Sequence, residues 1–181
     1  MFTGRKKELE YLNNYYEKPE DQIVVVYGQK GIGKTSLLQN FMKGKESFYY
    51  EAIPCSTRQQ RIYMADYIKN MGGTVSEIPE FQELFTLIED GSGKKKVFVI
   101  DEFQNLCKTD CEFFEALYRF LVRDNKKRDF FIVLCSSFIS WVENTMEDKL
   151  GEFSRIVSGF YKMKELNYQD FIKCFPDFSM L

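Results

Sequence analysis

Short apolar runs alternate along the chain with stretches in which apolar residues recur at the spacing of an α-helix. The apolar runs predict β-strands at residues 23–26, 97–100 and 130–134, with an aromatic strand at residues 47–53 and a short fifth strand at residues 159–163. The helical spacing predicts α-helices over residues 5–17, 34–42, 58–71, 79–89, 110–123 and 138–146. Strands that alternate with helices are typical of an α/β domain with a mainly parallel sheet.

Length and composition favour a single folded domain over residues 1–181. The chain is 44% hydrophobic and 29% charged, which argues against a disordered or fibrous protein. The net charge of −2 gives no overall reason to expect nucleic acid or an anionic membrane as a partner. No apolar run reaches the length of about eighteen residues that spans a bilayer, and the N-terminus lacks a signal-peptide core. We therefore predict a cytoplasmic protein without a membrane partner.

Cysteine and histidine usage narrows the possible chemistry. The five cysteines are scattered, which predicts a reducing compartment and no disulfide framework. Cys107 and Cys111 are four positions apart, a spacing that would suit one helical face, and we interpret them as small buried side chains in preference to zinc ligands. Because the chain has no histidine, any catalysis must use carboxylates, lysine, arginine, hydroxyls or a metal.

The strongest motif is the glycine-rich stretch YGQKGIGKTS at residues 27–36, between a predicted strand and a predicted helix. Gly28, Gly31 and Gly33 allow backbone turns that gather N–H groups around a phosphate, and the helix points its positive end at the same place. Lys34 adds a charge for the outer phosphates, and the Thr35 hydroxyl is a ligand for Mg²⁺. The sequence predicts a P-loop that binds ATP through Gly28, Gln29, Lys30, Gly31, Ile32, Gly33, Lys34, Thr35 and Ser36.

An acidic pair follows the predicted strand at residues 97–100. Asp101 is placed to hold Mg²⁺, and Glu102, which strand alternation would turn to the other side, to take a proton from an attacking water. The glutamate favours ATP hydrolysis over a small-molecule P-loop kinase, whose acceptor is a substrate hydroxyl. A solvated turn is the simpler alternative for such a pair.

Two serines follow the predicted strand at residues 130–134. If that strand lies between the P-loop strand and the Asp101 strand, Ser136 or Ser137 would reach toward the γ-phosphate or the attacking water. The alternative is that the serines cap the next helix.

Together, these motifs resemble the archaeal-type ATPases of the signal-transducing P-loop class, often abbreviated STAND. The matching pieces cover nearly the whole chain: Phe2-Thr3-Gly4-Arg5 with Glu8-Leu9, the P-loop, Phe48-Tyr49-Tyr50, Asp101-Glu102-Phe103-Gln104 and Cys135-Ser136-Ser137. The resemblance implies a three-layer sandwich with five strands in the order 5-1-4-3-2, and an ATP-dependent switch or motor. It also implies that Gly4 and Arg5 lie near the adenine and that Arg155 lies near the γ-phosphate, although helix entry and a surface position are the simpler alternatives.

Two departures from the family pattern affect what we expect. Cys135 stands where relatives often have glycine, and relatives continue past the position of Leu181 into a helical lid and a winged-helix domain. We therefore expect an ATPase core without those regions.

We expect ATP and ADP as ligands, and a protein partner or self-association. DNA contact is expected only through the additional regions. A nucleotide-gated interaction module with negligible turnover is the main functional alternative.

Overall fold

The structure is a computed structural model, and it describes residues 4–89, 93–122, 129–166 and 172. Phe2 and Thr3 of the N-terminal motif lie outside the described residues. The elements are α1 (Lys6–Tyr16), β1 (Gln22–Tyr27), α2 (Lys34–Met42), β2 (Ser47–Glu51), α3 (Thr57–Asn70), α4 (Phe81–Glu89), β3 (Lys96–Asp101), the 3₁₀ helix η1 (Phe103–Cys107), α5 (Glu112–Val122), β4 (Phe130–Ser136), α6 (Ile139–Asn144), α7 (Met146–Leu150), the 3₁₀ helix η3 (Gly151–Ile156) and β5 (Gly159–Lys162).

The five strands form one parallel sheet in the order β2-β3-β4-β1-β5. Read from the β5 edge this is 5-1-4-3-2, so the predicted order is confirmed. β4 lies between β1 and β3, and its Ser136 is opposite Tyr27 of β1. Because parallel strands point the same way, the carboxyl ends of β1, β3 and β4 meet at one edge of the sheet, where ligands bind in open α/β sheets.

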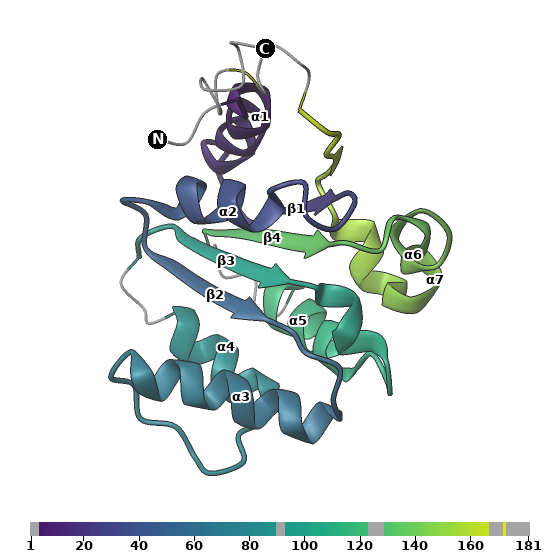
Figure 1. Ribbon diagram of the computed structural model, residues 1–181. Coiled ribbons are helices and arrows are strands. Elements are labelled where there is room, and N and C mark those ends of the chain that lie inside the picture. Colours follow the sequence, from purple (N-terminus) through teal and green to yellow (C-terminus); the bar gives the residue numbers. More distant parts are fainter. Residues whose placement is uncertain (1–3, 90–92, 123–128, 167–171, 173–181) are drawn as a thin grey trace.

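Helices cover both faces of the sheet and complete a three-layer sandwich (Figure 1). Alternate residues of the fully buried strands serve two different cores. Val24 of β1 packs with Leu37 in the core under α1 and α2. Its neighbour Val25 belongs to the opposite core, with Phe85 and the helices α3, α4 and α5. Burial on both faces explains why these strands are continuous apolar runs.

The segment after β4 differs from its prediction. The helix expected over residues 138–146 is two short helices, because Thr145, at φ −129°, is outside the helical range and separates α6 from α7. Gly151, at φ 52°, then ends α7. Hydrophobic periodicity predicted the buried side of this segment but could not show a single-residue break.

Cys107 and Cys111 do not lie on one helical face. Cys107 is the last residue of η1, and Cys111 lies just before α5. The predicted spacing is therefore interrupted by a turn between two helices. Within the described residues, no group of three metal-ligating side chains occurs, and both cysteines are free.

None of the helices in the described part of the chain is both long and apolar enough to span a bilayer.

Candidate functional site

The glycine-rich segment forms a tight turn between β1 and α2. A Cβ atom on Gly28 would lie 2.6 Å from the Met163 carbonyl oxygen and 2.6 Å from Cδ1 of Ile32, so only glycine fits there. Gly31 and Gly33 have φ values of 85° and 91°, in the left-handed region that other residues avoid. Left-handed residues in such a turn produce the concave arrangement of N–H groups that binds anions.

The N-terminus of α2 is open to an anion. Gly33 is its N-cap and provides no side-chain cap, and the first turn of the helix contains no acidic residue. The unpaired N–H groups and the positive end of the helix dipole therefore face the loop without a competing carboxylate. This is the arrangement that binds phosphate groups in proteins.

Lys34 is buried, with 6% of its surface exposed. Its ammonium donates hydrogen bonds to two loop carbonyls, to Gly28 at 2.9 Å and to Gln29 at 2.8 Å. The positive charge is thus held inside the turn by neutral acceptors. A phosphate that enters the loop offers a charged acceptor in their place, which makes a stronger hydrogen bond.

Thr35 and Asp101 meet where α2 approaches the end of β3. The Thr35 hydroxyl donates to Oδ2 of Asp101 at 2.9 Å, and the Tyr49 hydroxyl donates to the same oxygen at 2.8 Å. The backbone N–H of Glu102 donates to Oδ1 at 3.0 Å. Asp101 is only 3% exposed, so these three donors satisfy a buried carboxylate.

The buried carboxylate affects its neighbours. Burial, followed by the charge of Asp101, raises the pKa of the Tyr49 hydroxyl, which therefore stays a donor at neutral pH. Burial and the nearby Asp101 carboxylate also raise the pKa of the Cys135 thiol well above its ordinary value. The hydroxyl of Tyr49, like that of Thr35, therefore remains a neutral donor to the Asp101 carboxylate.

Glu102 lies just beyond β3 and has a left-handed backbone, with φ 51°. Its direction is set by this turn and not by the strand alternation that the sequence suggested. Oε2 of Glu102 accepts three hydrogen bonds, from the Ser137 hydroxyl at 2.7 Å, from the Ser137 N–H at 3.3 Å and from the Gln104 side-chain amide at 2.6 Å. The glutamate is therefore linked to the end of β4.

The two serines at the end of β4 make different contacts. Ser136 is fully buried, and its hydroxyl accepts from the N–H of Phe138 at 3.0 Å. The N-cap of α6 is Phe138 and no side chain caps that helix, so the expectation that a serine caps it is wrong. Ser137 carries the contact with Glu102. Arg155 lies on η3 with 75% of its side chain exposed, and it forms an ion pair with Glu152 at 2.9 Å. Catalytic roles for Ser136 and Arg155 stay predictions.

Arg5 connects the N-terminal segment to the P-loop. Its guanidinium donates to the Ile32 carbonyl at 2.7 Å, to the Lys164 carbonyl at 2.7 Å and to the Glu8 carboxylate at 2.8 Å. Gly4 precedes it with φ 86°. Arg5 is 6% exposed, so it is a buried connection and not only the start of a helix.

Two residues of this site received no role from the sequence. Tyr49 was part of an aromatic strand motif, and only the pairing of β2 with β3 brings it to Asp101. Gln104 follows Glu102 closely, but the turn into η1 is what folds its amide back onto the carboxylate. Its carbonyl oxygen is buried and, within the described residues, has no hydrogen-bond partner. The signal available in the sequence was the motif Asp101-Glu102-Phe103-Gln104 itself.

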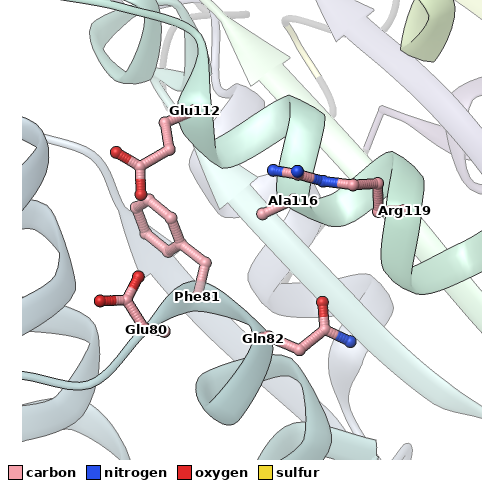
Figure 2. Close-up of a pocket in the computed structure, with 6 residues that line it drawn as sticks. All are labelled: Glu80, Phe81, Gln82, Glu112, Ala116 and Arg119. Carbon is pink, nitrogen blue, oxygen red and sulfur yellow. The ribbon is translucent and has the colours of Figure 1, made fainter.

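A separate groove of about 520 Å³ lies between α4 and α5. Figure 2 shows Phe81 on one wall, with acidic side chains on one side of the ring and Arg119 across from Gln82. None of its lining residues belongs to the phosphate loop or to the acidic pair. The groove is lined by Glu80, Phe81, Gln82, Glu112, Ala116 and Arg119.

Comparison with known proteins gives a family and several relatives. Residues 2–178 match a family model described as an ATPase domain predominantly from Archaea. An uncharacterized protein of Methanocaldococcus jannaschii is 26% identical over 180 residues, which cover 97% of this chain and 38% of the relative. An uncharacterized ATP-binding protein of the same organism is 28% identical over 137 residues, covering 58% of this chain and 40% of the relative. The chain thus spans less than half the length of these two relatives.

Solved structures with the same fold include two proteins of Aeropyrum pernix. The ORC2 protein, in ADPNP-ADP complexes, has a TM-score of 0.68 at 14% identity, over 88% of this chain and 47% of its own. The ORC1 protein, in complex with DNA, has a TM-score of 0.65 at 17% identity, over 99% of this chain and 50% of its own. At these identities the likeness shows the fold alone.

Proposed function

The chain belongs to the family of ATPase domains found predominantly in Archaea, and we propose that it binds ATP with Mg²⁺ on the P-loop and hydrolyses the γ-phosphate as a switch or motor. The observation that carries the proposal is the contact between Thr35 and Asp101, 2.9 Å apart beside the open N-terminus of α2. A hydroxyl and a carboxylate beside a P-loop are the groups that hold the cation of a bound nucleotide in P-loop proteins.

The residues present fit Mg²⁺. The cation prefers oxygen ligands, and the Thr35 hydroxyl and Asp101 carboxylate are oxygen donors already in contact. Tyr49 and the N–H of Glu102 would hold the Asp101 carboxylate in place. When bound, the cation would neutralise charge on the phosphates. Lys34 would exchange its loop carbonyls for phosphate oxygens, since these are the stronger acceptors.

Glu102 is the proposed general base. Its carboxylate would accept the proton of the attacking water, because the chain has no histidine and Asp101 is already committed to three donors. Ser137 and Gln104 would orient the carboxylate through Oε2, which leaves Oε1 to face the water. Ser136 and Arg155 are proposed contributors near the γ-phosphate, and Gly4 and Arg5 near the adenine, as in the signal-transducing class.

A second candidate function is a nucleotide-gated switch with negligible turnover. It is favoured by the three hydrogen bonds that Oε2 of Glu102 accepts from Ser137 and Gln104. A carboxylate held by several donors is a poorer proton acceptor until those bonds change. We place any protein or DNA partner of such a switch on regions that the longer relatives have and this chain does not span.

The test measures Mg·ATP binding and phosphate release for the parent chain, Lys34→Ala and Glu102→Gln. Lys34→Ala should weaken binding at least about tenfold, since a lost charged hydrogen bond is worth more than about 1.4 kcal/mol. Glu102→Gln should keep binding and lower phosphate release about a hundredfold or more. Lys43→Ala is the matched control, because Lys43 is exposed at the far end of α2.

The outcomes separate the candidates. Unchanged binding in Lys34→Ala would remove the P-loop assignment. Tight binding with negligible phosphate release from the parent would favour the switch. Phosphate release that Glu102→Gln leaves unchanged, or that a chelator of Mg²⁺ does not stop, would contradict the proposed hydrolysis.

A further inference from the structure

Two thiols that have no part in the proposed function lie in contact at the junction of η1 and α5. The Sγ atoms of Cys107 and Cys111 are 2.8 Å apart, and both cysteines are free. A disulfide bond is about 2.05 Å long, so the sulfurs need to approach by only about 0.8 Å. No other pair of cysteine sulfurs in the described residues has such a contact.

The two thiols differ in exposure. Cys107 is 8% exposed and belongs to the core, whereas Cys111 is half-buried and packs against that core from outside. Burial, followed by the contact with Cys111, raises the pKa of the Cys107 thiol, so it stays protonated at neutral pH. A soluble oxidant therefore meets Cys111 first, with a second thiol directly behind it.

The junction is fixed from both sides. The carbonyl of Cys111 accepts the N–H groups of Phe114 and Glu115 at 2.9 and 3.1 Å, which anchors it at the start of α5. Asp110, in the turn between the thiols, accepts from the Thr57 hydroxyl of α3 at 2.8 and 2.9 Å. The sulfurs are therefore held near each other by contacts that do not involve the sulfurs themselves.

We propose that Cys107 and Cys111 are a reversible dithiol–disulfide pair, a modification site that hydroperoxides oxidise and dithiols reduce. The Cys111 sulfur attacks the peroxide, the O–O bond breaks, water or an alcohol leaves, and Cys111 becomes a sulfenic acid. The Cys107 sulfur then attacks the Cys111 sulfur, the S–OH bond breaks, and water leaves with the Cys107 proton. Two thiols lose two electrons and the hydroperoxide gains them. A dithiol reverses the step by exchange.

The pair is close in the chain to the acidic end of β3. Cys107 ends η1, and Gln104 in the same 3₁₀ helix donates to Glu102. Oxidation would therefore fix the far end of the segment that carries Gln104. Any effect on turnover rests on the proposed function, but disulfide formation does not, and its readouts involve no nucleotide.

The experiment treats the reduced full chain with hydrogen peroxide, removes the oxidant, and counts free thiols after unfolding in denaturant. We expect the free thiols to fall from five to three, with a mass loss of two hydrogen atoms. Proteolysis should give one peptide pair that contains Cys107 joined to Cys111, and dithiothreitol should restore both thiols. This peptide map uses the unmodified sequence, so it does not depend on a variant that folds.

Variants sharpen the result. Cys55→Ser changes a cysteine outside the pair, and its four remaining thiols should still fall to two. Cys111→Ser should form no internal disulfide, and Cys107→Ser should accumulate a sulfenic acid on Cys111 that dimedone traps. Alkylation of both Cys107 and Cys111 after peroxide treatment would overturn the proposal. So would overoxidation of Cys111 with no linked peptide, or a disulfide that joins other cysteines.

Discussion

Asp101 is a buried carboxylate that depends on neutral donors. Tyr49, Thr35 and the N–H of Glu102 each donate to it, and Tyr49 comes from the neighbouring strand β2. When a buried charge loses a donor, its desolvation is no longer compensated and the folded state becomes less stable. The stability of the site therefore depends on a residue that does not belong to either of its two motifs.

We predict that Tyr49→Phe lowers the free energy of unfolding by about 1–2 kcal/mol, because the ring is kept and only the bond to Asp101 is lost. Denaturant unfolding followed by circular dichroism measures the change. Tyr67→Phe is the control: Tyr67 is 42% exposed, and the change should stay within about 0.5 kcal/mol. Equal effects of the two variants would mean that the hydroxyl of Tyr49 does not support Asp101.

The contrast between motif residues and Tyr49 shows what the sequence could predict at this scale. Roles for Lys34, Thr35 and Asp101 could be proposed from the sequence because each stands at a fixed position after a buried strand or in a glycine-rich turn. Tyr49 and Gln104 could not be assigned a role in this way, because their contacts depend on the pairing of two strands and on the left-handed turn at Glu102. Neither feature leaves a local pattern in the sequence.

At the scale of elements, the sheet was more predictable than the segments that connect it to the site. Every strand is within two residues of its prediction. For β1, β3 and β4 the reason is that strands buried on both faces require continuous apolar runs. The 3₁₀ helices η1 and η3 and the break at Thr145 were missed, because short helices have too few turns to show a period. The catalytic glutamate proposed here lies at one of these junctions.

Arg5 gives an element-scale prediction, because it joins the start of α1 to the P-loop and to the chain after β5. Arg5→Met keeps the apolar stem but leaves two carbonyls and the Glu8 carboxylate, which is 12% exposed, without their donor. We expect the free energy of unfolding to fall by about 2–4 kcal/mol. Arg5→Lys should recover only part of the loss, since an ammonium cannot reproduce the planar set of donors.

Lys6→Met is the matched control for Arg5. The Lys6 side chain is 90% exposed, and the substitution removes its 3.8 Å ion pair with Glu10. We therefore expect no measurable change in the free energy of unfolding. The free energy of unfolding in denaturant and the affinity for ATP are both measured for Arg5→Met, Arg5→Lys and Lys6→Met. If Arg5→Met unfolds like Lys6→Met, the buried connection does not stabilise the fold. If its stability falls while ATP binding is unchanged, Arg5 is structural and the proposed role near the adenine is wrong.

For the whole molecule, buried and half-buried tyrosines predict loss of stability at high pH. Burial is the largest cause of a raised pKa at each of six tyrosines, which lie on both faces of the sheet and near both of its edges: Tyr11, Tyr16, Tyr27, Tyr49, Tyr50 and Tyr161. In the unfolded chain each would lose its proton near pH 10. The native state keeps these protons to higher pH and so binds more of them than the unfolded state.

The sign of the effect follows from this difference in bound protons. Stability from a raised tyrosine pKa is fully present below about pH 10 and is lost as pH rises toward the folded-state value. Each tyrosine that stays neutral in the native state lowers the free energy of unfolding by at most about 1.4 kcal/mol per pH unit, and by less where solvent reaches the ring.

Denaturant unfolding between about pH 8 and 11, with tyrosinate absorbance recorded alongside, measures the slope of the free energy of unfolding against pH. Tyr49→Phe should make the slope shallower than that of the parent. A parent stability that is constant across this range would show that the tyrosines ionise as easily in the native protein as in the unfolded chain.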